Sequence, residues 1–237
     1  MTTTTPPADT ARESRNRAGS WVGSRMVSSR LIGSLFLLGF VCYGTGFALV
    51  SSVIGAADFP ASVAEKQTML VIGVFLMLMN TVVDVGKAVL FFPILDRYGR
   101  RTALTYLAAM IIEVVLLTIG ALSLLLLIPI AGGPAGGHSL APLAVAANAV
   151  AYQVAEMTLA IGCLFLFALL YRSRLIPRFL SVWGIAGYGI LLAGSVAELC
   201  GLQVGTILSI PGGLLELALA FWLLIKGFAP KAYDPVY

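Results

Sequence analysis

Six long apolar segments dominate this sequence of 237 residues and leave few folds open to it. They are Leu31–Ala57, Met69–Leu95, Thr102–Ile128, Ala141–Tyr171, Phe179–Leu202 and Val204–Phe228. Each is longer than the roughly 20 residues that a helix needs to cross the hydrocarbon core of a bilayer. The sequence therefore predicts an all-α fold, a polytopic membrane bundle of six transmembrane helices. The last two segments nearly merge, and the turn between them depends on Gly201, Gln203 and Gly205.

The composition agrees with a membrane protein. Only 11% of the residues are charged, whereas about a quarter are charged in an ordinary soluble domain. The net charge of +4 would point to nucleic acid in a soluble protein. In a membrane protein the basic residues are read as topology signals first, so we expect the lipid bilayer as partner and no nucleic acid.

The basic residues lie almost entirely on one side of the six spans. Thirteen of the fifteen Lys and Arg residues fall in the two tails and the even-numbered connections, only Lys66 falls on the opposite side, and Lys87 lies inside the second span. Positive residues favour the cytoplasmic side, so both termini are predicted to be cytoplasmic. We expect a multi-pass protein of the bacterial cytoplasmic (inner) membrane.

Three regions are expected along the chain. Residues 1–30 are rich in Thr, Ser, Pro and Arg, which predicts a disordered cytoplasmic tail. The apolar run that follows is too long for a signal-peptide core of about 7–15 residues. Residues 31–228 form the transmembrane domain and residues 229–237 a short cytoplasmic tail. The outer loops Asp58–Thr68 and Ala131–Leu140 are short, so any activity is expected within or beside the membrane.

Cysteine and histidine usage argues against a disulfide framework and a metal site. Cys42, Cys163 and Cys200 lie in apolar runs without a CxxC pair. The single histidine, His138, lies in a glycine-rich outer loop. We expect no metal and no cofactor.

Ionisable side chains inside the predicted spans are the main functional signal. They are Asp84 and Lys87 in the second span and Glu113, Glu156, Glu198 and Glu216 in the four that follow. A charge at the bilayer centre costs about 2.5–3.5 kcal/mol on insertion scales. These side chains are therefore expected to face the bundle interior or a wet cavity.

Helical spacing groups the polar residues into stripes. Asn80, Asp84 and Lys87 follow one another at i, i+4 and i+7. Two further stripes are Asn148, Tyr152 and Glu156 on the fourth span and Ser209, Gly213 and Glu216 on the sixth. Asp84, Glu113, Glu156 and Glu216 lie near mid-span, whereas Glu198 lies closer to the outer face.

Four mid-depth carboxyls face one ammonium group, so they cannot all ionise at low cost. Desolvation and like-charge repulsion should leave at least one of them as a neutral acid that can donate a proton. The predicted catalytic acids are Asp84, Glu113, Glu156 and Glu216. The predicted substrate-binding residues are Asn80, Lys87, Tyr152 and Glu198. Two structural alternatives stay open: Asp84 and Lys87 as a simple i, i+3 ion pair, and the glutamates as hydrogen-bonding contacts between helices.

Several stretches resemble a bacterial family of six-helix membrane proteins of unknown function. They are Tyr171–Arg178 with Trp183–Gly187, Pro211–Glu216 with Trp222–Phe228, and Ile111–Glu113. The first pair looks like a cytoplasmic turn of that family, the second like its last helix, and Glu113 matches the acid of its third helix. The similarity covers roughly residues 28 to 230 and implies fold and location, but little chemistry.

The chain also resembles, more weakly, small actinobacterial membrane-bound terpene cyclases of indole-sesquiterpenoid pathways, which are of similar size. That resemblance implies protonation of an alkene or epoxide of a prenyl chain by intramembrane acids. The aspartate-rich DDxxD and DxDD patterns of soluble cyclases are absent from the sequence, so magnesium-driven ionisation of a diphosphate is not supported.

Three functions are compatible with these residues. The first is an acid-catalysed cyclase or isomerase whose apolar isoprenoid substrate enters from the bilayer, with aromatic faces such as Tyr152 stabilising the carbocation. The second is a proton-coupled small-molecule carrier, for which Pro211–Gly213 is the only candidate helix break. The third is an accessory or scaffold subunit. Gly184 and Gly187 permit close helix contact, within one chain or in a homo-oligomer.

Overall fold

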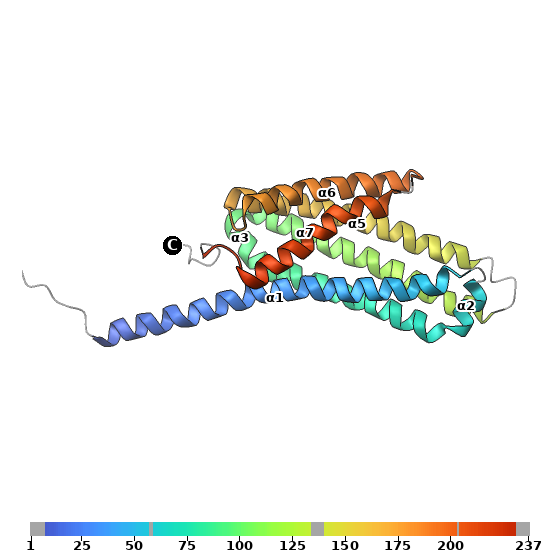
Figure 1. Cartoon of the computed structure of the whole chain (residues 1–237), viewed down its shortest axis with the longest axis horizontal. Helices are drawn as coiled ribbons and strands as arrows, with labels where there is room; N and C mark the ends of the chain where they lie inside the picture. Colours follow the sequence, from blue (N-terminus) through green and yellow to red (C-terminus); the bar gives the residue numbers. More distant parts are fainter. Residues whose placement is uncertain (1–7, 57–58, 134–139, 203, 231–237) are drawn as a thin grey trace, which may run out of the picture.

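The computed structural model describes residues 8–56, 59–133, 140–202 and 204–230, and nearly all of them are helical (Figure 1). The long helices are α1 (Ala8–Ile54), α3 (Gln67–Leu125), α5 (Ala141–Ser173), α6 (Arg178–Leu199) and α7 (Gly205–Ile225). Two short helices, α2 (Phe59–Glu65) and α4 (Leu127–Ala131), pack against each other at one end of the bundle. No strand occurs in the described ranges, and the predicted all-α fold is confirmed.

The longest helix, α3, contains two of the predicted spans. It is interrupted at Gly99, whose backbone (φ 177°, ψ 86°) is not helical, and the parts before and after it run in opposite directions (Figure 1). With α4 the stretch comprises 65 residues, which as one straight helix would measure about 98 Å and far exceed the bilayer. Within the described part of the chain, five helices are long and apolar enough to span a membrane. Because α3 crosses twice, they provide the six predicted crossings.

The first helix begins earlier than the sequence predicted. α1 starts at Ala8, so residues 8–30 are helical where a disordered tail was expected, and Figure 1 shows this part projecting beyond the other helices. Extending a nucleated helix fixes one residue for each hydrogen bond gained, and Ala, Arg, Glu and Met all have good helix propensity. This corrects the tail prediction for residues 8–30, while residues 1–7 lie outside the described part of the chain.

The turns between the long helices contain glycine and basic residues. The break at Gly99 lies against Leu169, so the turn 96–101 and the turn 172–178 lie at the same end of the bundle. Both turns are rich in Arg, and we call this end the basic end. At the other end, Gly201 adopts a positive φ of 90° between α6 and α7, as the predicted turn requires. Asp58, Gln203, His138 and the tail from Lys231 onward lie outside the described residues.

The buried apolar residues form two clusters with a polar layer between them. The cluster near the basic end includes Ile32, Phe36, Phe91, Tyr106 and Leu166. The cluster near the opposite end includes Val50, Leu70, Val74, Ala121 and Ala144. On α3, for example, Met77 belongs to the second cluster and Phe91 to the first, with Asp84 between them. The intramembrane polar residues therefore lie at mid-depth, as their positions in the predicted spans indicated.

Candidate active-site cavity

A cavity of about 270 Å³ occupies the polar layer between the two apolar clusters. Its wall is formed by residues of α1, both halves of α3, α5, α6 and α7. The structure brings seven of the eight predicted site residues to this cavity: Asn80, Asp84, Lys87, Glu113, Tyr152, Glu156 and Glu216. Helices that are far apart in sequence thus present the acids to one enclosed space.

Asp84 is held as one member of an ion pair in the first half of α3. Its Oδ1 lies 2.6 Å from Lys87 Nζ, and its Oδ2 accepts a hydrogen bond of 2.7 Å from Asn80 Nδ2. Lys87 Nζ also lies 4.5 Å from the centre of the Phe36 ring, a cation–π contact. Both carboxylate oxygens of Asp84 therefore have partners, which stabilises its ionised form.

A glycine on α1 makes room for this group. A Cβ atom added to Gly39 would lie 2.8 Å from Asn80 Oδ1, closer than real Cβ contacts come. Gly39 therefore lets α1 approach α3 at the level of the ion pair.

Two of the glutamates are each matched with a tyrosine hydroxyl. The Tyr188 hydroxyl on α6 donates a hydrogen bond to Glu216 Oε1 on α7. On α5 the hydroxyl of Tyr152 lies within hydrogen-bonding reach of the Glu156 carboxyl, one helical turn away. These phenols orient the carboxyl groups without adding a charge.

Glu113 has a different environment from the other acids. It is only 4% exposed, and its Oε2 atom has no hydrogen-bond partner among the described residues. Buried carboxyl oxygens are normally hydrogen-bonded, so an orphaned one beside a cavity calls for a partner that the protein itself does not provide. A water molecule or a ligand in the cavity can supply it.

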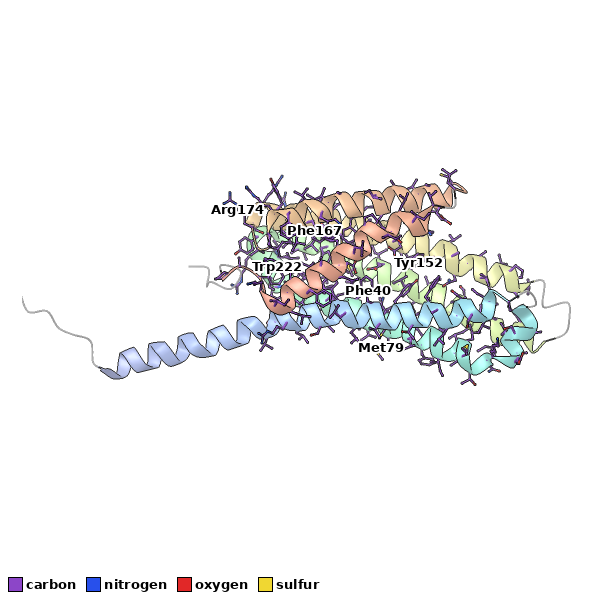
Figure 2. All side chains as sticks on the ribbon, viewed as in Figure 1. Phe40, Met79, Tyr152, Phe167, Arg174 and Trp222 are labelled. Atoms are coloured by element: carbon purple, nitrogen blue, oxygen red, sulfur yellow. The ribbon has the colours of Figure 1, made fainter. Side chains whose placement is uncertain are left out.

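Aromatic side chains that the sequence analysis did not select complete the wall. Tyr43 on α1 stacks on Tyr152 with ring centres 5.9 Å apart, and Phe36, Phe40 and Tyr188 also line the cavity. Figure 2 labels Phe40 on α1 and Tyr152 on α5, both beside α7. The first span has no acidic or basic residue that would mark it as part of a site. The sequence does hold one pattern that predicts which face of this span lines the site. Phe36, Phe40 and Tyr43 follow one another at i, i+4 and i+7 and therefore share one face of the helix.

The structure does not bring Glu198 to the cavity. Its Oε2 accepts a hydrogen bond of 2.7 Å from the backbone nitrogen of Gly205, the first residue of α7. Backbone N–H groups at a helix start lack partners within the helix, and a carboxylate nearby also interacts well with the helix dipole. Glu198 therefore closes the turn between α6 and α7, a structural position rather than a place at the site.

Comparison with known proteins shows the family to which the chain belongs. The model of DUF4386, a domain of unknown function, matches residues 31–227. The chain belongs to the DUF4386 family. This confirms the predicted membership of a family of unknown function and covers all six crossings of this DUF4386 chain. No curated protein and no solved structure matches the chain, and the resemblance to terpene cyclases gains no support.

The DUF4386 cavity is suited to proton transfer. Among the residues that the structure describes, Lys87 is the only basic one that lines the cavity, and it forms an ion pair with Asp84. Among these residues Glu113, Glu156 and Glu216 form no salt bridge of their own, and burial of an uncompensated charge is costly, so these three carboxyls are the candidate proton donors. Within the described ranges no group of three or more His, Cys, Asp and Glu side chains is arranged to hold a metal ion. That the protein uses no metal or cofactor stays a prediction.

Proposed function

We propose that this DUF4386 protein is an integral-membrane enzyme that cyclises or isomerises an apolar isoprenoid by acid catalysis. The observation that carries the proposal is the pairing inside the cavity: four carboxyls share it with a single ammonium group, which is bound to Asp84. We propose that the three carboxyls outside the ion pair serve as neutral acids and that the carboxyl paired with Lys87 serves as the ionised base. General acid–base chemistry needs these two groups within reach of one substrate.

The proposed reaction moves protons and changes no oxidation state. A neutral carboxyl among Glu113, Glu156 and Glu216 gives its proton to an alkene carbon or an epoxide oxygen, and a carbocation forms. An internal alkene then attacks the cation, which makes a carbon–carbon bond and shifts the positive charge. A neighbouring C–H finally loses its proton to a carboxylate, and a double bond forms. The product has the mass of the substrate, and the protein regains its proton count.

The remaining residues of the cavity fit this chemistry. Asp84, kept ionised by Lys87 and Asn80, is the proposed final base. The rings of Phe40, Tyr43 and Tyr152 supply negatively polarised faces that stabilise a passing cation. The volume of about 270 Å³ lies just below the roughly 300–1,000 Å³ of pockets for drug-sized ligands. This favours a short isoprenoid, or one that is only partly enclosed.

One observation favours the enzyme over a proton-coupled carrier. Many carriers bind at helices that are broken near mid-membrane. At the candidate break Pro211–Gly213, α7 stays helical, and the Pro211 carbonyl accepts a hydrogen bond of 3.1 Å from Trp183 Nε1 on α6. The continuous helix supports a fixed cavity wall.

An isomerisation assay tests the proposal. Membranes that contain the protein are incubated with linear and epoxidised farnesyl-bearing acceptors, and products of unchanged mass but altered retention are sought. We expect a new isomer with the wild type. Each of Glu113→Gln, Glu156→Gln and Glu216→Gln should show whether its carboxyl is the donor, and the donor variant should lose at least a hundredfold in rate, a typical share for general acid catalysis.

Glu198→Gln is the matched control, since it changes an acid of the same membrane domain outside the cavity. Unaltered turnover in the amide variants of all four cavity acids would overturn the proposal. Uptake of a solute driven by a proton gradient into proteoliposomes, lost in Glu216→Gln, would favour the carrier instead. A stable partner together with tolerance of every amide variant would favour the scaffold.

A further inference from the structure

We propose that the cavity opens sideways into the bilayer between α1 and α7, and that it takes a single-chain isoprenoid head first, with an uncharged hydrogen-bonding head group at the inner end. The proposal rests on the proposed function for the isoprenoid nature of the chain. It adds the route of access, the orientation of the substrate and the chemistry of its head group.

The distance between α1 and α7 changes along their length. Near the basic end the two helices touch: a Cβ on Gly33 would lie 2.8 Å from the Ala220 carbonyl oxygen, and the Phe228 nitrogen donates to Ser29 Oγ at 3.4 Å. Towards the other end they separate, and in Figure 1 α7 rises away from α1 to lie along α6. The contact is thus closed at the basic end and open from mid-depth onward.

The cavity reaches the surface in this opening. Phe40 and Gly44 of α1 and Gly213 of α7 all line the cavity, yet Phe40 is 36% exposed and Gly44 is exposed as well. A Cβ on Gly44 would meet no atom within 4 Å, and one on Gly213 would lie 3.6 Å from the Phe40 ring. These three residues form the mouth of the cavity.

The surface around the mouth is apolar. The neighbouring exposed side chains are Val41 and Phe47 on α1 and Ile210 and Leu214 on α7. At mid-depth of a membrane span such side chains face hydrocarbon, because polar groups exposed to lipid there are costly. A ligand that arrives through the mouth therefore comes from the acyl-chain region of the bilayer, and a hydrocarbon chain can stay in the mouth after binding.

The inner end of the cavity sets the chemistry of the head group. Lys87 is engaged by Asp84, and the wall holds no other basic residue. A phosphate, diphosphate or carboxylate head would enter beside four carboxyls without a cation to receive it, which is strongly unfavourable. An alcohol, ketone or epoxide oxygen needs only a hydrogen-bond partner, and the unpartnered Oε2 of Glu113 provides one.

Photoaffinity labelling tests the proposal without reference to turnover. The purified protein in lipid nanodiscs is exposed to a farnesol probe that carries a diazirine and an alkyne on its tail, and the labelled protein is quantified after irradiation. We expect saturable labelling of the segments around Phe40–Gly44 and Gly213. Farnesol should compete with the probe, whereas farnesyl diphosphate at the same concentration should not.

Variants of the mouth and of the inner end complete the test. Gly44→Trp fills the mouth and should lower labelling at least tenfold, while Gly189→Trp, on α6 where a Cβ also meets no atom within 4 Å, should label as the wild type does. Gly213→Leu is the second mouth variant, in case the first does not fold. Glu113→Gln keeps a hydrogen-bonding group and should retain labelling within threefold, whereas Glu113→Leu should lose it.

Three results would overturn the proposal: no saturable labelling of the wild type, wild-type labelling of folded Gly44→Trp and Gly213→Leu, or competition by the diphosphate equal to that by farnesol. Failure of the proposed function has a different signature. In that case the probe labels as described, but the wild type makes no isomer, or Glu113→Gln, Glu156→Gln and Glu216→Gln, together with Asp84→Asn, turn over normally.

Discussion

At the scale of single residues, four carboxyls that look alike in the sequence have three kinds of surroundings. Asp84 has a cation and an amide, Glu216 and Glu156 each have a phenol, and Glu113 keeps one oxygen without a partner. Sequence reasoning placed all four at one depth, because charge and span boundaries fix depth. It could not assign all of their roles, because the partner of Glu216 is Tyr188 on another helix and the unpartnered oxygen of Glu113 is visible only in the structure.

The Asp84–Lys87 pair supplies the first prediction. Lys87→Met leaves the Asp84 charge buried without a counterion, and breaking a buried pair in this way costs about 3–5 kcal/mol. We expect a correspondingly lower unfolding free energy, measured by denaturant titration in mixed micelles. The double variant Asp84→Asn/Lys87→Met should recover most of the loss, and a double variant no more stable than Lys87→Met would contradict the buried-pair interpretation.

The second prediction concerns the phenol at Glu216. Tyr188→Phe removes the donor to a largely enclosed carboxyl, and an unsatisfied buried acceptor costs about 1–3 kcal/mol. The free energy of unfolding of the variant should fall by that amount. Tyr171→Phe, at an exposed tyrosine near the basic end, is the control and should shift by less than about 0.5 kcal/mol. Equal shifts in the two variants would rule out a special role for the Tyr188 hydroxyl.

At the scale of helices, the apolar periodicity predicted the spans better than it predicted their ends. The six crossings were predicted from six separate apolar segments, two of which lie in α3 on either side of the break at Gly99. The start of α1 was missed, because a polar stretch carries no hydrophobic signal. Glu198 was placed at the site because its cap partner, the first turn of α7, has no sequence signature of its own.

Helix packing between α5 and α6 gives a third prediction. A Cβ on Gly184 would lie 2.3 Å from Cδ1 of the Phe167 ring, so Gly184→Ala overpacks this contact. Overpacking of this kind typically costs about 1–3 kcal/mol. Thermal unfolding in detergent should detect the loss, and Gly189→Ala on the same helix, where no atom lies within 4 Å, should be neutral. A neutral Gly184→Ala would mean that the two helices separate easily.

The fourth prediction separates the structural position of Glu198 from a binding role. Glu198→Ala removes the acceptor for the Gly205 N–H, and loss of a helix N-terminal cap costs about 0.5–2 kcal/mol. Stability should fall by this amount while labelling by the farnesol probe stays unchanged. Loss of labelling in a folded Glu198→Ala protein would return this residue to the site.

At the scale of the whole molecule, a polar layer lies between two clusters of buried apolar residues. The sequence predicted this arrangement, since mid-span acids on several helices must meet inside the bundle. The sequence did not predict the proposed opening between α1 and α7. That opening depends on the angle at which two helices cross, and the crossing angle is decided by contacts such as those of Gly33 and Ser29 at one end only.

The reversal at Gly99 also bears on how the chain is inserted into its membrane. The two halves of α3 follow each other without a loop, so they reach the insertion machinery almost together. One half carries the Asp84–Lys87 pair, already joined within a single helical turn, and the other carries Glu113. A hairpin that enters as a unit can bury these groups against each other before any of them meets lipid. The tight reversal that brings these acids to one cavity would thus also favour insertion of the two halves as one hairpin.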